Sequence, residues 1–278
     1  MKLTKWLSIG VVLLGGVLVL TGCGQAKSQT VEDQKVVKLG VVGENNEPWE
    51  YVKKELADKE NIQLELVKFT DYRTPITALE DGSIDLHACL TEIFMDTVNE
   101  ESGYDNTTIA YTTLNPLGVY SNKIKDLKEL EDEAIVAVPN DVSNQSRALL
   151  LLQTAGLIKV NPDKGLLPDI SDIIENPKKL TFKSLDSNQT ARALADVDIS
   201  LINNGMAVDA GLIPTKDAIF LEPIADSSKP YYNVIAARKE EKDSKVYQKI
   251  IAAYQTDEVA KIIAETTENS SIPVWDKK

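Results

Sequence analysis

The sequence predicts an α/β protein with two lobes, the first built from both ends of the chain and the second inserted in its middle. Strand-like and helix-like segments alternate along the chain, as in domains whose sheets are covered by helices. After the middle of the chain, a β-rich run at 232–237 precedes a helical tail at 245–268. The predicted first lobe therefore covers 36–122 and 228–278, and the second covers 123–227.

Short β-branched runs and amphipathic segments define the elements of the first lobe. We expect strands at 36–42, 62–69 and 84–86 and helices at 49–59 and 75–81. The second lobe shows the same alternation, with expected strands at 134–138, 180–185 and 198–202 and helices at 143–155 and 188–195. Gly82 and Gly156 each follow a predicted helix, where glycine favours its termination. Mostly parallel sheets are the expected result.

Composition excludes several classes of function. The 278 residues include 30 basic and 43 acidic side chains, for a net charge of −13, which disfavours nucleic-acid binding and electrostatic adsorption to membranes. One His and two Cys cannot form an ordinary all-Cys/His zinc site, so we expect no metal and no cofactor. Nucleotide-binding glycine motifs and a serine-hydrolase elbow are both missing from the sequence.

The N-terminus has the layout of a secretory signal. Lys2 and Lys5 precede an apolar run that ends in Leu20-Thr21-Gly22-Cys23. This ending resembles a bacterial lipobox, which implies cleavage of residues 1–22 and attachment of lipid to the sulfur of Cys23. An ordinary signal peptide that happens to contain Cys is the alternative. Residues 23–35 then read as a polar tether.

Arg147 is the most informative charged residue, because we place it in the first turn of the helix at 143–155. A guanidinium grips a carboxylate through two parallel hydrogen bonds, and a helix N-terminus adds partial positive charge. Together they would form a seat for an anion. The alternative is a surface Arg paired with a neighbour such as Asp141.

Asn203 and Asn204 follow a predicted strand, at the edge where open α/β sheets bind ligands. An amide can accept from an ammonium group and donate to a carboxylate, which suits an amino acid. The alternative is a loop Asn that fixes its own backbone, and Asn233 carries the same ambiguity. His87 has no partner motif, so we interpret it as a structural residue.

Seven separate segments resemble one known family. They are Thr70–Pro75, Pro139–Leu152, Ala155–Ile158, Glu175–Leu180, Ile202–Asn204, Asn233–Ile235 and Tyr254–Val259. In order and spacing, from about Val36 to Trp275, they look like the methionine-binding lipoproteins of ABC importers, the MetQ/NlpA family.

The resemblance implies a periplasmic-binding-protein-like fold with two crossover strands and a ligand cleft between the lobes. It further implies that Arg147 grips the ligand carboxylate, that Asn203 and Asn233 hold the amino-acid head, and that Tyr72 lines the cleft. The protein would be anchored by lipid at the extracytoplasmic face of the cell membrane and would deliver its ligand to an ABC-importer permease. Partners would be a small molecule, the permease and the membrane, with no nucleic acid.

The sequence departs from the family where the ligand side chain is read. Cys89, Leu90, Thr91, Ile93 and Phe94 stand where the family usually has Phe, Gln, His, Pro and Tyr. Ile76 likewise replaces a common Asn, and Gly205-Met206 replaces Asn-Tyr. We expect Cys89, Thr91 and Phe94 to line the side-chain end of the site. Methionine, a bulkier apolar amino acid and a methionine-containing dipeptide are therefore all candidate ligands.

Two rival functions come from other classes. A surface-displayed adhesin or scaffold would keep the fold and lose the ligand, but it would need none of the three head-group residues. An extracytoplasmic enzyme would need a nucleophile, base or metal cluster, and the sequence singles out none. The prediction is a binding protein and not an enzyme.

Overall fold

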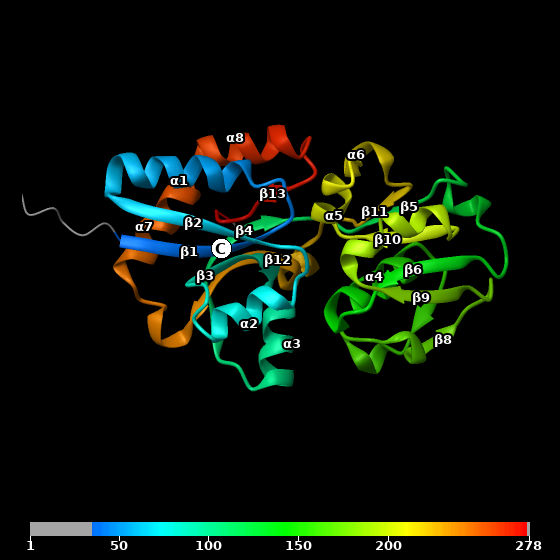
Figure 1. Ribbon diagram of the computed structural model, residues 1–278. Helices are drawn as coiled ribbons and strands as arrows, with labels where there is room; N and C mark the ends of the chain where they lie inside the picture. The colour runs from blue at the N-terminus through cyan, green and yellow to red at the C-terminus, as the bar shows by residue number, and fades with distance from the viewer. Residues whose placement is uncertain (1–34, 277–278) are drawn as a thin grey trace, which may run out of the picture. The chain divides into compact units, whose positions relative to one another are not determined.

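The computed structural model describes residues 35–276, which form an α/β unit with two main sheets (Figure 1). The predicted signal segment, Cys23 and nearly all of the predicted tether lie outside the described residues. No helix within residues 35–276 is both long enough and apolar enough to cross a bilayer.

The larger sheet has six strands in the order β13-β4-β12-β3-β1-β2. Its strands are β1 (Lys35–Val42), β2 (Ile62–Phe69), β3 (Leu86–Thr91), β4 (Asn106–Leu114), β12 (Tyr232–Arg238) and β13 (Ile272–Pro273). Early and late parts of the chain thus share one sheet, as the sequence predicts.

The second sheet has five strands in the order β11-β5-β10-β6-β9, and β7 and β8 form a separate pair. These strands are β5 (Gly118–Tyr120), β6 (Ile135–Pro139), β7 (Lys159–Val160), β8 (Ile173–Glu175), β9 (Thr181–Leu185), β10 (Ile199–Ile202) and β11 (Phe220–Leu221). All of them come from the middle of the chain.

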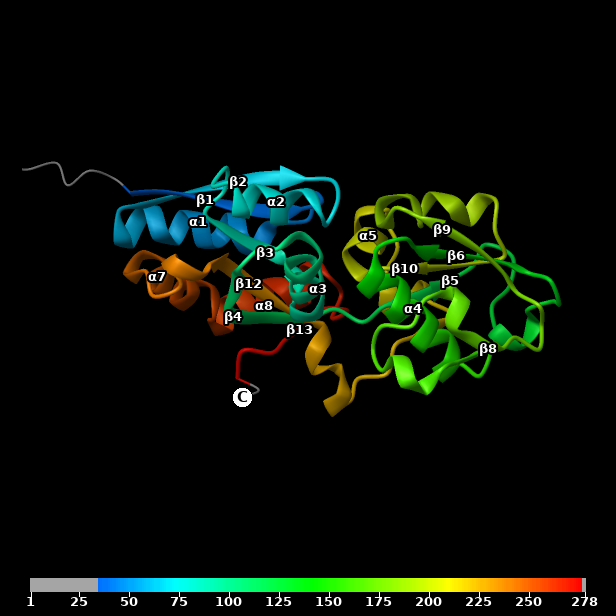
Figure 2. The same cartoon turned by 90° about the horizontal axis from the view of Figure 1, so that it is seen from below.

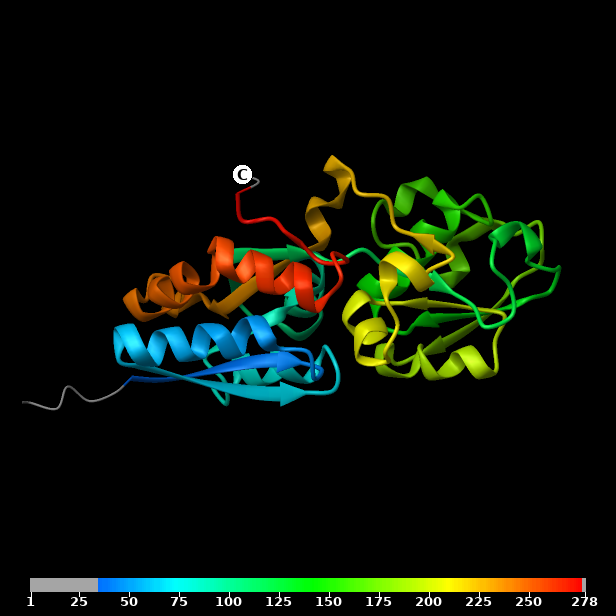
Figure 3. The same ribbon diagram turned by 90° about the horizontal axis from the view of Figure 1, so that it is seen from above.

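Eight α-helices accompany the sheets within residues 35–276. They are α1 (Glu47–Glu60), α2 (Thr74–Glu80), α3 (Glu92–Ser102), α4 (Val142–Thr154), α5 (Asn204–Asp209), α6 (Pro214–Asp217), α7 (Lys245–Tyr254) and α8 (Asp257–Thr266). Around the larger sheet, α1, α7 and α8 cover one face, and Figure 3 shows them side by side. Helices α2 and α3 cover the other face, which Figure 2 shows from below.

The chain passes between the sheets twice. The first passage, at 115–117, follows β4, and the second, at 222–231, follows β11. The first comes earlier than the predicted boundary after residue 122, because Gly118–Tyr120 pairs with β10 in the second sheet. The sequence predicts mostly parallel sheets, but both sheets contain parallel and antiparallel strand pairs. The returning strand β12 runs antiparallel to β3 and β4, and β5 runs antiparallel to β10 and β11.

Two predicted helices differ from the structure. The segment 188–195 forms short 3-10 turns, because the carbonyl of Thr190 accepts a hydrogen bond from Ser200 Oγ at 2.8 Å. The predicted helical tail is two helices, since Thr256 starts α8 as its N-cap and accepts from the Val259 N–H at 3.2 Å. Helix α3 and strand β4 had no prediction.

Asp209, at the end of α5, joins the part of the chain around the second sheet to the loop after β1. Its carboxylate accepts from the backbone N–H groups of Glu44 and Asn45 at 3.2–3.3 Å. Gly43 makes this approach feasible, because its φ is +80° and a Cβ there would lie 2.0 Å from Asp209 Oδ2.

His87, the single His of the chain, lies in β3 with no exposed surface. Its Nδ1 lies 3.3 Å from the Cys89 nitrogen and 3.4 Å from the Gly40 carbonyl oxygen, and its Nε2 has no partner among the described residues. Burial lowers the pKa of the imidazole to about 4. His87 lies outside the pocket described below, in agreement with its predicted structural role.

We predict that His87 makes the free energy of unfolding fall as the pH falls from 6.5 to about 4. Over that window the unfolded chain binds a proton that the folded chain excludes, so folded stability is lost, by roughly 3 kcal/mol in total. Urea unfolding at pH 7, 5.5 and 4.5 should show a smaller decline for His87→Gln than for the unmodified protein. Identical pH dependence in the two proteins would contradict the assignment.

Candidate functional site

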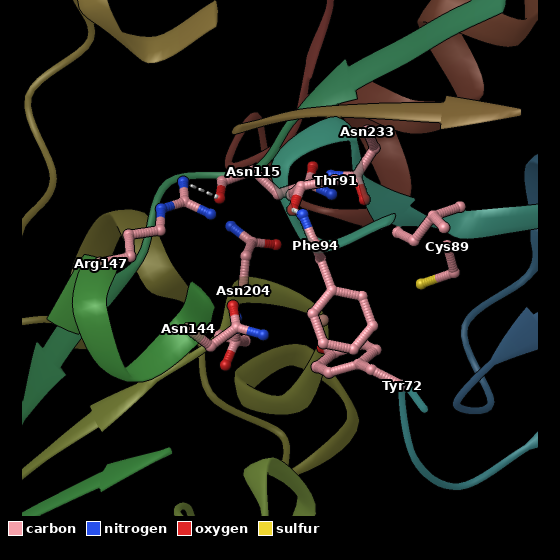
Figure 4. A pocket seen from close by; sticks show the side chains of 12 residues that line it. Tyr72, Cys89, Thr91, Phe94, Asn115, Asn144, Arg147, Asn204 and Asn233 are labelled. Carbon is pink, nitrogen blue, oxygen red and sulfur yellow. Dashed lines mark hydrogen bonds between the residues drawn. The ribbon is translucent and has the colours of Figure 1, made fainter. Parts of the chain in front are cut away.

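A pocket with a cavity volume of about 60 Å³ lies between strands of the larger sheet and the helices and loops that accompany the second sheet. Its walls come from β3, the first turn of α3, the passage after β4, helix α4, the start of α5 and strand β12. Figure 4 shows Arg147, Asn115 and Asn204 at one end and the rings of Tyr72 and Phe94 at the other. The lining residues are Tyr72, Cys89, Leu90, Thr91, Phe94, Asn115, Asn144, Arg147, Asn203, Asn204, Gly205 and Asn233.

Arg147 is buried, and its guanidinium is held on two sides by the passages between the sheets. Nε donates to the Glu222 carboxylate at 2.9 and 3.1 Å, and Nη2 donates to the same carboxylate and to the Asn115 carbonyl at 3.0 Å. The Tyr231 ring stacks against the guanidinium, and the distance between the ring centroid and Arg147 Cζ is 4.5 Å. Nη1 has no hydrogen-bond acceptor among the described residues, so it is available to a ligand.

This arrangement corrects two expectations about Arg147. The residue is not a surface Arg paired with Asp141, because it is 3% exposed and its partner is Glu222. It also lies in the second turn of α4, since that helix begins at Val142. The helix N-terminus is capped by the Asp141 carboxylate, which accepts from Asn144 N–H at 3.0 Å. The anion seat is therefore the guanidinium and not the helix end.

A chain of amides positions the polar end of the pocket. Asp141 accepts from Asn144 Nδ2 at 2.9 Å, and Asn144 Oδ1 accepts from Asn203 Nδ2 at 2.7 Å. These bonds use the Nδ2 end of the Asn203 side chain. Asn203 Oδ1 is left as a buried acceptor without a partner among the described residues, and Asn115 Oδ1 is a second such acceptor. Buried acceptors that stay unpaired are costly, so such atoms mark places where a donor binds.

The opposite end of the pocket is apolar. Tyr72 and Phe94 meet edge to face, with ring centroids 6.5 Å apart. Thr91 caps α3 by accepting from the Phe94 N–H at 3.3 Å, so its hydroxyl is partly committed to the helix. Burial raises the pKa of the Cys89 thiol to about 11, which keeps it protonated and uncharged at neutral pH. This end suits an apolar side chain.

All seven residues predicted to bind a ligand line this one pocket, although they are far apart in the sequence. They are Tyr72, Cys89, Thr91, Phe94, Arg147, Asn203 and Asn233. Sequence reasoning missed Glu222 and Asn115, because both lie in the passages between the sheets, where no periodicity marks them. Asn144 also lines the pocket, and its side chain accepts the hydrogen bond that fixes Asn203.

The charges of the site suit a zwitterion. Glu222 neutralises Arg147, and the remaining polar lining consists of amides, the hydroxyls of Thr91 and Tyr72 and the Cys89 thiol. A molecule with one carboxylate and one ammonium group would keep the buried site neutral, whereas a net anion or cation would add an uncompensated charge. The free Nη1 can take the carboxylate, and the Oδ1 atoms of Asn203 and Asn115 can accept from the ammonium.

Comparisons with known proteins show which family and which solved structures this chain resembles. The NlpA lipoprotein family matches residues 37–275. The D-methionine-binding lipoprotein MetQ of Escherichia coli is 39% identical over 277 residues, covering 99% of each chain. Among solved structures, PG110 from Staphylococcus aureus is 45% identical with a TM-score of 0.83, and the alignment covers 86% of this chain and 94% of that one. A nutrient-binding protein from Burkholderia cenocepacia, solved with methionine bound, is 40% identical with a TM-score of 0.82, covering 85% and 99%.

We predict that Glu222→Gln lowers the free energy of unfolding by about 3–5 kcal/mol, because it leaves the Arg147 charge buried without its partner. Glu175→Gln is the matched control. Its ion pair with Lys159 is 62% and 56% exposed, so its loss should cost at most about 1 kcal/mol. Urea unfolding of the three proteins measures both values. Equal losses in the two variants would show that Glu222 does not hold Arg147.

Proposed function

Because the chain belongs to the NlpA lipoprotein family, we propose that it is a lipid-anchored solute-binding protein of an ABC importer that binds methionine or a related amino acid. One observation carries the proposal. The pocket joins an unused guanidinium N–H and unpaired amide acceptors at one end to an apolar aromatic wall at the other. This is the pattern of charge and polarity that an apolar α-amino acid requires. A methionine-containing dipeptide would share the same terminal groups.

In the proposed binding mode, Arg147 Nη1 donates to the ligand carboxylate. Asn203 Oδ1 and Asn115 Oδ1 accept from the ammonium, and Asn233, whose amide has no partner among the described residues, completes the head-group contacts. The side chain extends between Tyr72 and Phe94. These residues come from elements around both sheets, so one ligand would contact the two halves of the protein at once. Such contacts favour a closed conformation, which the permease would receive.

The proposal is for a binding protein and not an enzyme, and the named relatives are binding proteins. A scaffold that had lost its ligand would have no use for buried acceptors without partners. Asn203 Oδ1 and Asn115 Oδ1 are such acceptors, and they favour a binder over the scaffold.

We predict that methionine binding depends on the ligand carboxylate. Calorimetry should show binding of L- or D-methionine, and methioninamide, which lacks the carboxylate, should bind about 2–5 kcal/mol more weakly. Arg147→Ala should abolish detectable binding, and Arg147→Lys should restore little, because the planar fork is lost. Arg192→Ala is the control, since Arg192 is exposed and away from the pocket. Methioninamide that binds as tightly as methionine would refute the proposed seat.

Cys23 is the proposed site of lipid attachment. Two acyl chains give stable anchoring, whereas one chain gives only reversible binding. We therefore predict that Cys23→Ala removes the protein from the membrane fraction or leaves an unprocessed precursor. Metabolic labelling with a fatty-acid analogue, followed by fractionation, measures both effects. Undiminished label on the Cys23→Ala protein would place the lipid elsewhere.

A further inference from the structure

A second cavity of about 120 Å³ adjoins the pocket and is twice its volume. The two share four lining residues, Cys89, Asn115, Asn204 and Gly205. Beyond them the second cavity reaches the loop after β1, the start of α1 and the helices α7 and α8. The shared residues therefore belong to the walls of both cavities.

Two of these shared residues are small and come from different elements. Cys89 comes from β3, and Gly205 lies in the first turn of α5. A Cβ added at Gly205 would meet nothing closer than Tyr72 Oη at 4.0 Å, so the space beside it is open. The Cys89 side chain is likewise short and uncharged. A large side chain at either position would fill the space between the two cavities.

The walls of the second cavity are largely apolar. Its non-polar lining residues are Val42, Pro48, Trp49, Cys89, Val208, Tyr254 and Ile263. Trp49 and Tyr254 stack with ring centroids 4.2 Å apart, which gives this wall a rigid aromatic surface.

Most polar groups of that lining already have partners. Thr266 Oγ1 donates to Ile262 O at 2.8 Å and Thr267 Oγ1 donates to Ile263 O at 2.7 Å, while Asp209 accepts from backbone N–H groups. Asn115 Oδ1, described above, and Tyr254 are exceptions. The Tyr254 side chain is buried, with 4% of the residue exposed, and its hydroxyl makes no hydrogen bond within residues 35–276.

We propose that the second cavity is an extension of the ligand site that accepts amino-acid side chains longer than that of methionine. The side chain would pass between Cys89 and Gly205 and end against Trp49 and Tyr254. This inference rests on the proposed function, because the amino-acid head remains on Arg147 and the amides. Its ligand class is an α-amino acid with a long, mainly apolar side chain, with room for one polar group at the Tyr254 hydroxyl. In other proteins a dry apolar cavity of about 150 Å³ holds a benzene ring, so a ring suits the space available.

S-benzyl-L-homocysteine is the probe, since it is methionine with a benzyl group in place of the S-methyl group. Calorimetry should show that the unmodified protein binds both L-methionine and the probe. Val208→Trp should weaken the probe by about tenfold or more and leave methionine nearly unchanged, because Val208 lines the second cavity and not the head-group pocket. Thr266→Phe should do the same from another wall of that cavity, and it decides the question if Val208→Trp fails to fold.

Val208→Thr is the matched control, because it keeps the size of the side chain and should retain both ligands. A protein that binds methionine and rejects the probe overturns the extension and leaves the proposed function intact. Undiminished binding of the probe by Val208→Trp and Thr266→Phe also overturns it, since the second cavity would then play no part. If neither methionine nor the probe binds, the proposed function fails and the extension fails with it.

Discussion

The buried pair of Arg147 and Glu222 fixes the geometry on which the rest of the site depends. Arg147 comes from α4, Glu222 from the second passage between the sheets, and the Asn115 carbonyl that also accepts from Arg147 comes from the first passage. One guanidinium thus ties both connecting segments to one helix. Removing a partner from such a pair leaves a charge in a region of low dielectric, which is far costlier than losing an exposed ion pair. The residue proposed to hold the ligand is therefore also the residue that holds the passages in register.

The hydrogen bonds of the site divide its atoms into two groups. Those that position side chains are complete within the protein, as in the series from Asp141 through Asn144 to Asn203. Those that face the pocket are incomplete, as at Arg147 Nη1, Asn203 Oδ1 and Asn115 Oδ1. The first group holds the second in place, so the cost of arranging the polar contacts is met before a ligand binds. This division also explains how a strongly acidic protein offers a locally neutral site.

Much of this structure could be predicted from the sequence. Helix α4 and strands β1 and β2 have strong local patterns, and their boundaries were predicted within two residues. Arg147, Asn203 and Asn233 stand out in the sequence by residue type and position. The motif resemblance adds the other ligand-lining residues, because it carries long-range information that periodicity lacks. Glu222 and Asn115 escaped prediction because their roles arise where two distant passages meet Arg147. The 3-10 turns at 188–195 escaped for a related reason, since the bond from Ser200 to the Thr190 carbonyl is a tertiary contact. Mixed strand directions likewise depend on how the chain returns between sheets.

The contact between Gly43 and Asp209 makes the residues tolerated at two positions 166 residues apart in the sequence depend on each other. Any side chain at position 43 would occupy the space that the Asp209 carboxylate fills, while a shorter residue at position 209 would leave the N–H groups of Glu44 and Asn45 without their acceptor. Neither position can change alone without loss, so substitutions there should arise together or not at all. The contact therefore constrains the loop after β1 and the end of α5 together.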